Sequence, residues 1–144
     1  MVIGYTSGVY DLFHIGHLNL LKNAKSMCDK LIVGVTTDEL SLYKNKRPII
    51  SYEDRLEIVR SIVYVDAVVP QADMNKVEMC EKVKANVLFV GDDWYKTDKW
   101  CELEKKLENI NVKVVYFPYT QSISTTKIRE VLKLTKDARE SLSK

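Results

Sequence analysis

Short apolar runs alternate with segments of helical periodicity along most of the chain. The five runs are rich in β-branched residues and span residues 1–6, 30–36, 63–69, 86–90 and 112–117. Most of them lack the polar alternation of a half-exposed strand, so they are predicted to be buried on both faces. The pattern predicts an α/β fold: a single Rossmann-like doubly wound domain with a mainly parallel five-stranded sheet.

Helix starts are marked by capping residues. Thr37 opens a short helical turn, Ser51 opens a longer helix, and Ser124-Thr125-Thr126 is predicted to cap a last helix over residues 127–134. The strand predicted over residues 63–69 is expected to end at Pro70. Residues 1–134 are therefore predicted to form the domain, and residues 135–144 a polar tail.

Composition excludes several function classes. A net charge of +2 over 144 residues gives no broad basic face for nucleic acid. The three cysteines are far apart, which favours neither a metal pair nor a disulfide framework and suggests a reducing cytoplasm. No apolar stretch approaches the ~20 residues that span a bilayer, and none has the form of a signal peptide. A cytoplasmic protein is expected.

A glycine-bearing turn follows the first run and carries both histidines of the chain, His14 and His17. Unpaired N–H groups at a helix start form an anion site, and imidazoles add further donors. A zinc site is disfavoured because no third ligand is evident nearby. Asp11 either caps the turn, or orients a histidine or a metal.

Two further motifs are expected at the same edge of the sheet, because each follows a strand. Asp92, Asp93 and Trp94 are either a turn with a core indole, or a carboxylate and ring that hold a ribose and base. Ser124, Thr125 and Thr126 suit an N-cap and equally a terminal phosphate.

Cations gather in the middle of the chain. Lys44, Lys46 and Arg47 form either a solvated loop or a loop that folds over the site. Arg55 stands in the first turn of its helix, where the helix dipole disfavours a cation, which indicates attraction to an anion.

Taken together, these residues resemble a known family. His14-Ile15-Gly16-His17 matches the HxGH signature of the nucleotidylyltransferase superfamily, and Ile123-Ser124-Thr125-Thr126 resembles its second signature. Tyr64-Val65-Asp66 resembles a cytidylyltransferase motif. Gly91-Asp92-Asp93-Trp94, with Lys44, Lys46 and Arg55, is similar to the bacterial glycerol-3-phosphate cytidylyltransferases.

The resemblance implies an enzyme that transfers CMP from CTP to a phosphorylated small alcohol, most simply glycerol 3-phosphate, for cell-surface polymer synthesis. It implies that His14 and His17 bind the triphosphate, and that Lys44 and Lys46 hold the phosphates of acceptor and CTP. It further implies Mg²⁺ with CTP and a homodimer. The other residues placed at the nucleotide are Gly8, Val9, Asp11, Gly16, Arg55, Asp92, Asp93, Trp94, Ser124, Thr125 and Thr126.

Two positions depart from the glycerol-3-phosphate enzymes: Val63 and Tyr119 stand where those enzymes carry arginine. Arg60 or Arg129 is a candidate for the replacement charge. Val9-Tyr10 is more similar to the phosphocholine cytidylyltransferases. The alternatives are therefore an enzyme that uses ATP or another phospho-alcohol such as phosphocholine, or a nucleotide-binding module with weakened catalysis.

Overall fold

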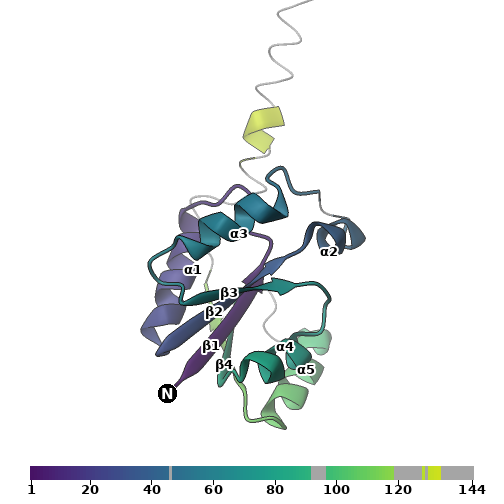
Figure 1. Cartoon of the computed structure of the whole chain (residues 1–144). Helices are drawn as coiled ribbons and strands as arrows, with labels where there is room; N and C mark the ends of the chain where they lie inside the picture. Colours follow the sequence, from purple (N-terminus) through teal and green to yellow (C-terminus); the bar gives the residue numbers. More distant parts are fainter. Residues whose placement is uncertain (46, 92–96, 119–127, 129, 134–144) are drawn as a thin grey trace, which may run out of the picture.

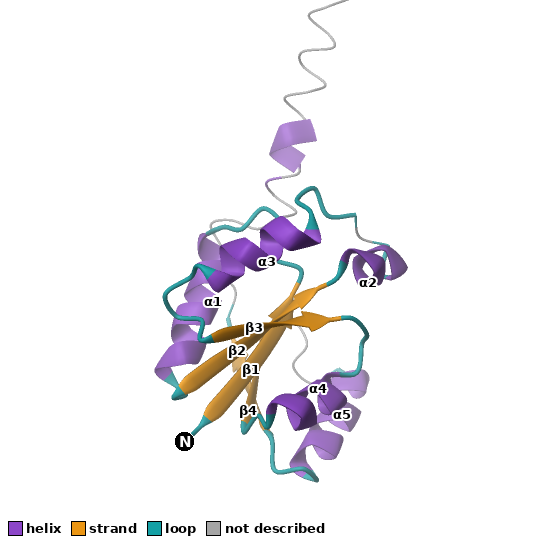
Figure 2. Cartoon of the chain, in the orientation of Figure 1, coloured by secondary structure: helices purple, strands orange, loops and turns teal. Residues whose placement is uncertain are grey.

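Five parallel strands form one sheet in the order β3-β2-β1-β4-β5 (Figures 1 and 2). The computed structural model describes residues 1–45, 47–91, 97–118, 128 and 130–133. The strands are β1 (Ile3–Gly8), β2 (Lys30–Thr36), β3 (Ala67–Gln71), β4 (Val87–Gly91) and β5 (Lys113–Phe117). All four strand pairings are parallel, which confirms the predicted fold class.

Helices cover both faces of the sheet (Figure 2). The helices are α1 (Ile15–Ser26), α2 (Asp38–Tyr43), α3 (Tyr52–Arg60), α4 (Lys76–Val83) and α5 (Asp98–Glu108). α1 and α3 pack on one face, α4 and α5 pack on the other, and α2 follows the carboxyl end of β2. Among the described residues, no helix combines the length and the apolar character needed to cross a membrane.

The core has one layer on each side of the sheet. Under α1 and α3 it consists of Leu21, Ala24, Leu31, Val33, Val35, Val59 and Phe89, with Tyr10 from the turn after β1. Under α4 and α5 it is built mainly of Tyr5, Ile32, Cys80, Leu88, Val90, Trp100 and Leu107. Each large apolar side chain so buried contributes roughly 1.5–3 kcal/mol. Burial on two faces explains why the strands are continuous apolar runs.

β3 differs from its prediction. The strand spans Ala67–Gln71 and contains Pro70, whereas the sequence predicted residues 63–69 with Pro70 as the end. β3 is an edge strand that pairs only with β2. The missing N–H of Pro70 therefore costs no hydrogen bond to a second neighbouring strand. Just before the strand, the Asp66 carboxylate accepts from the Leu31 N–H at 2.7 Å, which holds this residue in the connection.

Side chains cap the starts of α2, α3 and α4. The side-chain oxygens of Thr37, Ser51 and Asn75 each accept a hydrogen bond from the backbone N–H three residues later, which belongs to Leu40, Asp54 and Glu78 respectively. The first two confirm predicted caps. The predicted cap at 124–126 and the tail at 135–144 lie outside the described residues; residues 128 and 130–133 are helical.

The chain reverses its direction of winding at β1. This strand lies between β2 and β4, so β2 and β3 are added on one side of it and β4 and β5 on the other. The carboxyl ends of β1, β4 and β5, which precede the three predicted motifs, lie at one edge of the sheet because all strands are parallel. Such a switch point is where doubly wound folds bind ligands.

Candidate active site

The two histidines close the N-terminus of α1 by a reciprocal cap. The Nδ1 atom of His14 accepts from the N–H of Gly16 at 3.0 Å, and Nδ1 of His17 accepts from the N–H of His14 at 3.2 Å. This is a capping box in which imidazoles replace the usual hydroxyl and carboxylate. α1 therefore begins at Ile15, three residues before the apolar periodicity that indicated it.

This cap fixes the tautomer of both rings. A neutral imidazole has one N–H donor, and Nδ1 of each ring is already an acceptor. The proton of each ring therefore resides on Nε2, the atom that faces away from the capped backbone. The turn consequently presents two Nε2–H donors beside the start of a helix.

Packing keeps both rings neutral. The His14 and His17 rings are stacked with their centroids 4.0 Å apart, and Tyr10 and Phe13 flank His17. Burial lowers the pKa of His17 to about 4, helped by His14 and opposed by Asp11. Burial also lowers the pKa of His14. At neutral pH the pair therefore donates hydrogen bonds without carrying charge.

The turn that leads to the histidines is strained. Tyr10 and Leu12 have φ angles of 56° and 50°, in the left-handed region that costs roughly 1–2 kcal/mol per non-glycine residue. A Cβ added to Gly8 would come within 3.1 Å of the buried Tyr10 ring, so Gly8 serves close packing inside the turn. Such strain persists where the surroundings over-determine the backbone, often at functional sites.

Arg55 does not lie free to bind a nucleotide, and its predicted role is corrected. Its side chain is fully buried, and Nη2 pairs with the Asp38 carboxylate at 2.6 Å. Its Nε and Nη1 atoms donate to the main-chain carbonyls of Ile50, Val9 and Thr36. The anion that draws this cation to the helix start is therefore Asp38, a carboxylate of the protein itself.

Asp11 is also held by partners within the protein. It is 2% exposed, and its two carboxylate oxygens accept from the N–H groups of Ile49 and Ile50, each at 2.9 Å. These two bonds join residues that are 38 and 39 positions apart in the sequence. Asp11 ties the histidine turn to the segment that follows Lys44, and its charge raises the pKa of His17.

Lys44 and Arg47 follow α2, which begins just after the carboxyl end of β2. Lys44 is the C-cap of α2 and is half-buried, while Arg47 is exposed. Of the two candidates for a replacement charge, Arg129 lies outside the described residues. Arg60 pairs with Glu57 in the last turn of α3, whereas Arg55, at the start of that helix, contacts the histidine turn. Val63, where the resembling enzymes carry arginine, is 85% exposed.

Lys76 is a cation that the sequence analysis missed. It is half-buried at the first position of α4, its Nζ donates to the Ser7 hydroxyl at 3.3 Å, and it lies 5.3 Å above the Trp100 ring. Ser7 belongs to the carboxyl end of β1, so Lys76 brings its charge beside the switch point. The sequence did contain a signal: Lys76 is a cation at the start of a helix, where the helix dipole disfavours positive charge.

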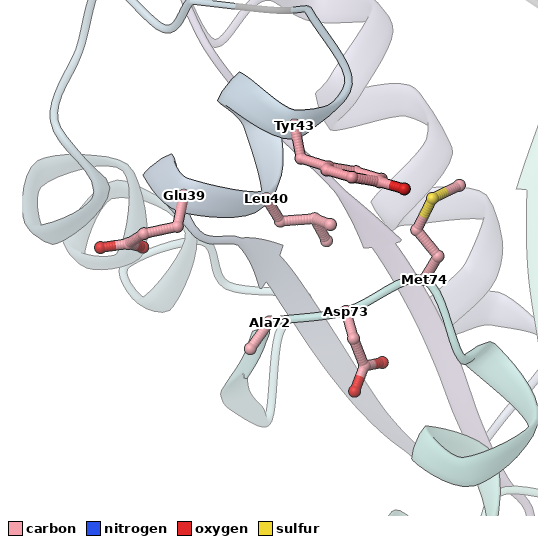
Figure 3. A pocket seen from close by; sticks show the side chains of 6 residues that line it. All are labelled: Glu39, Leu40, Tyr43, Ala72, Asp73 and Met74. Carbon is pink, nitrogen blue, oxygen red and sulfur yellow. The ribbon is translucent and has the colours of Figure 1, made fainter.

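A shallow pocket of about 410 Å³ opens at the same edge, between α2 and the loop after β3 (Figure 3). The side chains of Tyr43 and Met74 point toward one another beside Leu40 (Figure 3). The remaining lining residues are Glu39, Ala72 and Asp73. The volume suits a small ligand.

Several predicted site residues lie outside the described residues, and their roles stay predictions. They are Lys46, Asp92, Asp93, Trp94, Ser124, Thr125 and Thr126. All of them except Lys46 come after β4 or β5 in the sequence, and these strands end at the edge where the histidines lie. Val9 belongs to the same turn as the histidines, and its carbonyl accepts a hydrogen bond from Arg55.

Known proteins share this fold and sequence. The chain is 41% identical over 127 residues to the glycerol-3-phosphate cytidylyltransferase of Bacillus subtilis, covering 87% of this chain and 92% of that one. It is 40% identical to the enzyme of the same name from Staphylococcus aureus (88% and 92%) and 32% identical to the FAD synthase of Thermococcus kodakarensis (87% and 85%). A lipopolysaccharide core biosynthesis protein of Thermoplasma volcanium superimposes with a TM-score of 0.71 at 26% identity, over 85% of this chain and 99% of that one.

A family model described as cytidylyltransferase-like matches residues 5–131, which include most of β1, the histidine turn and helices α1 to α5. The match covers most of the chain, and the sheet with its switch-point histidines is the scaffold expected of that resemblance. The protein is therefore a member of the cytidylyltransferase-like family.

Proposed function

We propose that the protein transfers CMP from CTP to a small phosphorylated alcohol, with glycerol 3-phosphate as the first candidate. The observation that carries the proposal is the pair of neutral, Nε2-protonated histidines at the start of α1. The relatives from Bacillus subtilis and Staphylococcus aureus, both named glycerol-3-phosphate cytidylyltransferase, support this acceptor. The product would be a CDP-alcohol, an activated donor suited to building cell-surface polymers.

The proposed step is an in-line displacement. A phosphate oxygen of the acceptor attacks the α-phosphorus of CTP, a new O–P bond forms, and the bond to the bridging oxygen breaks as pyrophosphate leaves. Little covalent work is required of the protein beyond positioning and charge stabilisation. The Nε2–H groups of His14 and His17 would donate to the oxygens on which charge develops.

The acceptor is proposed to lie beside β1 and β2. Lys44 and Lys76 would supply positive charge for its phosphate from the end of α2 and the start of α4, and the pocket between α2 and the loop after β3 would receive the alcohol. Lys46, Ser124 and Thr125 remain proposed contacts to the phosphates of CTP, and Asp92, Asp93 and Trp94 to the ribose and base.

Magnesium is proposed to accompany the triphosphate. Among the described residues, no group of three histidine, cysteine or acidic side chains could hold a metal ion, and both oxygens of Asp11 accept backbone N–H groups. These residues do not form a magnesium cage, so the proposal rests on the affinity of Mg²⁺ for substrate phosphates.

A cytoplasmic location and a pair of identical subunits complete the proposal. Cys28, Cys80 and Cys101 are free thiols, which favours a reducing compartment, where CTP is also available. The pairing of subunits rests on the family resemblance, and sedimentation equilibrium would test it.

A pyrophosphate-release screen tests the function. CTP and ATP are each offered with glycerol 3-phosphate, phosphocholine and riboflavin 5′-phosphate, the last because an FAD synthase is among the relatives. Turnover is expected with CTP and glycerol 3-phosphate. CTP binding by calorimetry without pyrophosphate release from any pair would support the weakened binding module instead.

The pocket has a test of its own. Ala72 is exposed on the rim, so Ala72→Trp would fill the pocket with little effect on folding. We expect the KM for the acceptor to rise about tenfold, the loss of roughly 1.4 kcal/mol of binding, while the KM for CTP stays within twofold. Equal changes in both constants would contradict this placement of the alcohol.

A further inference from the structure

The guanidinium of Arg55 joins four segments at the carboxyl edge of the sheet. Its Nη1 donates to the carbonyls of Val9 at 2.7 Å and Thr36 at 2.8 Å, and its Nε donates to the carbonyl of Ile50 at 2.9 Å. Its Nη2 pairs with Asp38 at 2.6 Å. These partners belong to the histidine turn, the end of β2, the loop before α3 and the first turn of α2.

Asp11 makes a second connection between the same parts. Its carboxylate, inside the histidine turn, accepts from the N–H groups of Ile49 and Ile50. Lys44 lies in the sequence between Asp38 and Ile49. The stretch that carries Lys44 is therefore tied to the histidine turn on both sides, through Arg55 at its start and through Asp11 at its end.

We propose that Arg55 and Asp11 are positioning residues: together they hold Lys44 at a fixed place relative to His14 and His17, without touching substrate. This rests on the proposed function. Transfer requires the acceptor and the α-phosphorus to be aligned, and a misplacement of about 1 Å costs on the order of 10²-fold in rate. The strained Tyr10 and Leu12 of the turn need such external anchors to stay in place.

Two conservative variants remove the connections with little change of size. Asp11→Asn keeps one acceptor oxygen but presents an NH₂ group to the second backbone N–H. Arg55→Lys keeps the charge, yet a single ammonium cannot reach four separated acceptors. Arg60→Ala and Asp29→Asn are matched controls: Arg60 is an exposed arginine of the same helix, and Asp29 accepts the N–H of Val2 at the opposite edge of the sheet.

Kinetics are measured at pH 8, where His17 is neutral with or without the charge of Asp11, and at a temperature where circular dichroism shows each variant folded. We expect kcat to fall at least tenfold in Asp11→Asn and Arg55→Lys, with the KM for CTP changed less than threefold. The controls should stay within twofold. A lower melting temperature with unchanged kcat would show that the two residues only stabilise the fold, and would overturn the proposal.

A double-mutant cycle tests the link to Lys44. If Asp11 acts through Lys44, the tenfold loss from Asp11→Asn should shrink below threefold in a Lys44→Ala background. Losses that multiply would overturn the proposal. Amide hydrogen exchange gives a readout without turnover: exchange at Ile49 and Ile50 should rise at least tenfold in Asp11→Asn and stay unchanged in Asp29→Asn. A wild-type protein that releases no pyrophosphate would refute the proposed function, and unchanged exchange at Ile49 and Ile50 would independently refute the connection.

Discussion

His14 and His17 lie ring against ring, with centroids 4.0 Å apart, and each uses its Nδ1 atom to cap the helix on which they stand. The same two side chains therefore serve folding through Nδ1 and would serve catalysis through Nε2. The two roles can be separated experimentally because they use different atoms.

Substitutions that preserve the cap should abolish activity at little cost in stability. Asn at position 14 retains an acceptor for the N–H of Gly16, and Gln at position 17 is the residue that a capping box normally uses. Neither supplies the Nε2–H donor in the same place. We expect His14→Asn and His17→Gln to lower kcat by about 10²–10³-fold, as for the loss of one oxyanion donor.

Chemical denaturation supplies the comparison for these variants. His14→Ala removes donor and cap together and should lose about 1 kcal/mol of unfolding free energy, whereas His14→Asn should lose less than half of that. Turnover within tenfold of wild type in both cap-preserving variants would be incompatible with the catalytic role of Nε2.

Stability should fall on the acid side because His17 is held neutral. Burial lowers its pKa from an ordinary value of 6.5 to about 4. The unfolded chain therefore takes up a proton as the pH falls below 6.5 while the folded chain does not, and the loss is complete near pH 4. Urea unfolding at pH 7.5 and 4.5 should show the wild type losing roughly 2–3 kcal/mol more than His17→Gln. Parallel losses in both proteins would argue against a buried neutral imidazole.

Replacing Lys76 should weaken the use of the acceptor substrate and leave the stability of the fold unchanged. Its charge lies beside Ser7 at the end of β1, and the dipole of α4 disfavours it there. We expect Lys76→Ala to reduce kcat/KM for the acceptor about tenfold, without lowering the melting temperature. Lys82, an exposed lysine in the last turn of the same helix, provides the control, since Lys82→Ala should keep kcat/KM within twofold. Equal kinetics for the two variants would remove Lys76 from the site.

Short-range features of the sequence determined the strands, two of the helix starts and the histidine turn. The apolar runs predicted the strands and their parallel order of connection, and the side chains of Thr37 and Ser51 predicted two helix starts. The histidine turn was recognisable because its function as a cap and anion site depends on residues within a few positions of one another. These features follow from periodicity and short-range hydrogen bonds, which the sequence displays directly.

Tertiary structure decided which of the charged residues face one another. Arg55 and Asp11 were predicted at the nucleotide, but the fold gives them partners 46 and 38 residues away, at Val9 and Ile49. Lys76 reaches Ser7 across 69 residues, and Pro70 is tolerated in β3 only because that strand lies at the edge. Such contacts depend on strand order and crossover, which bring distant segments together and leave no periodic trace in the sequence.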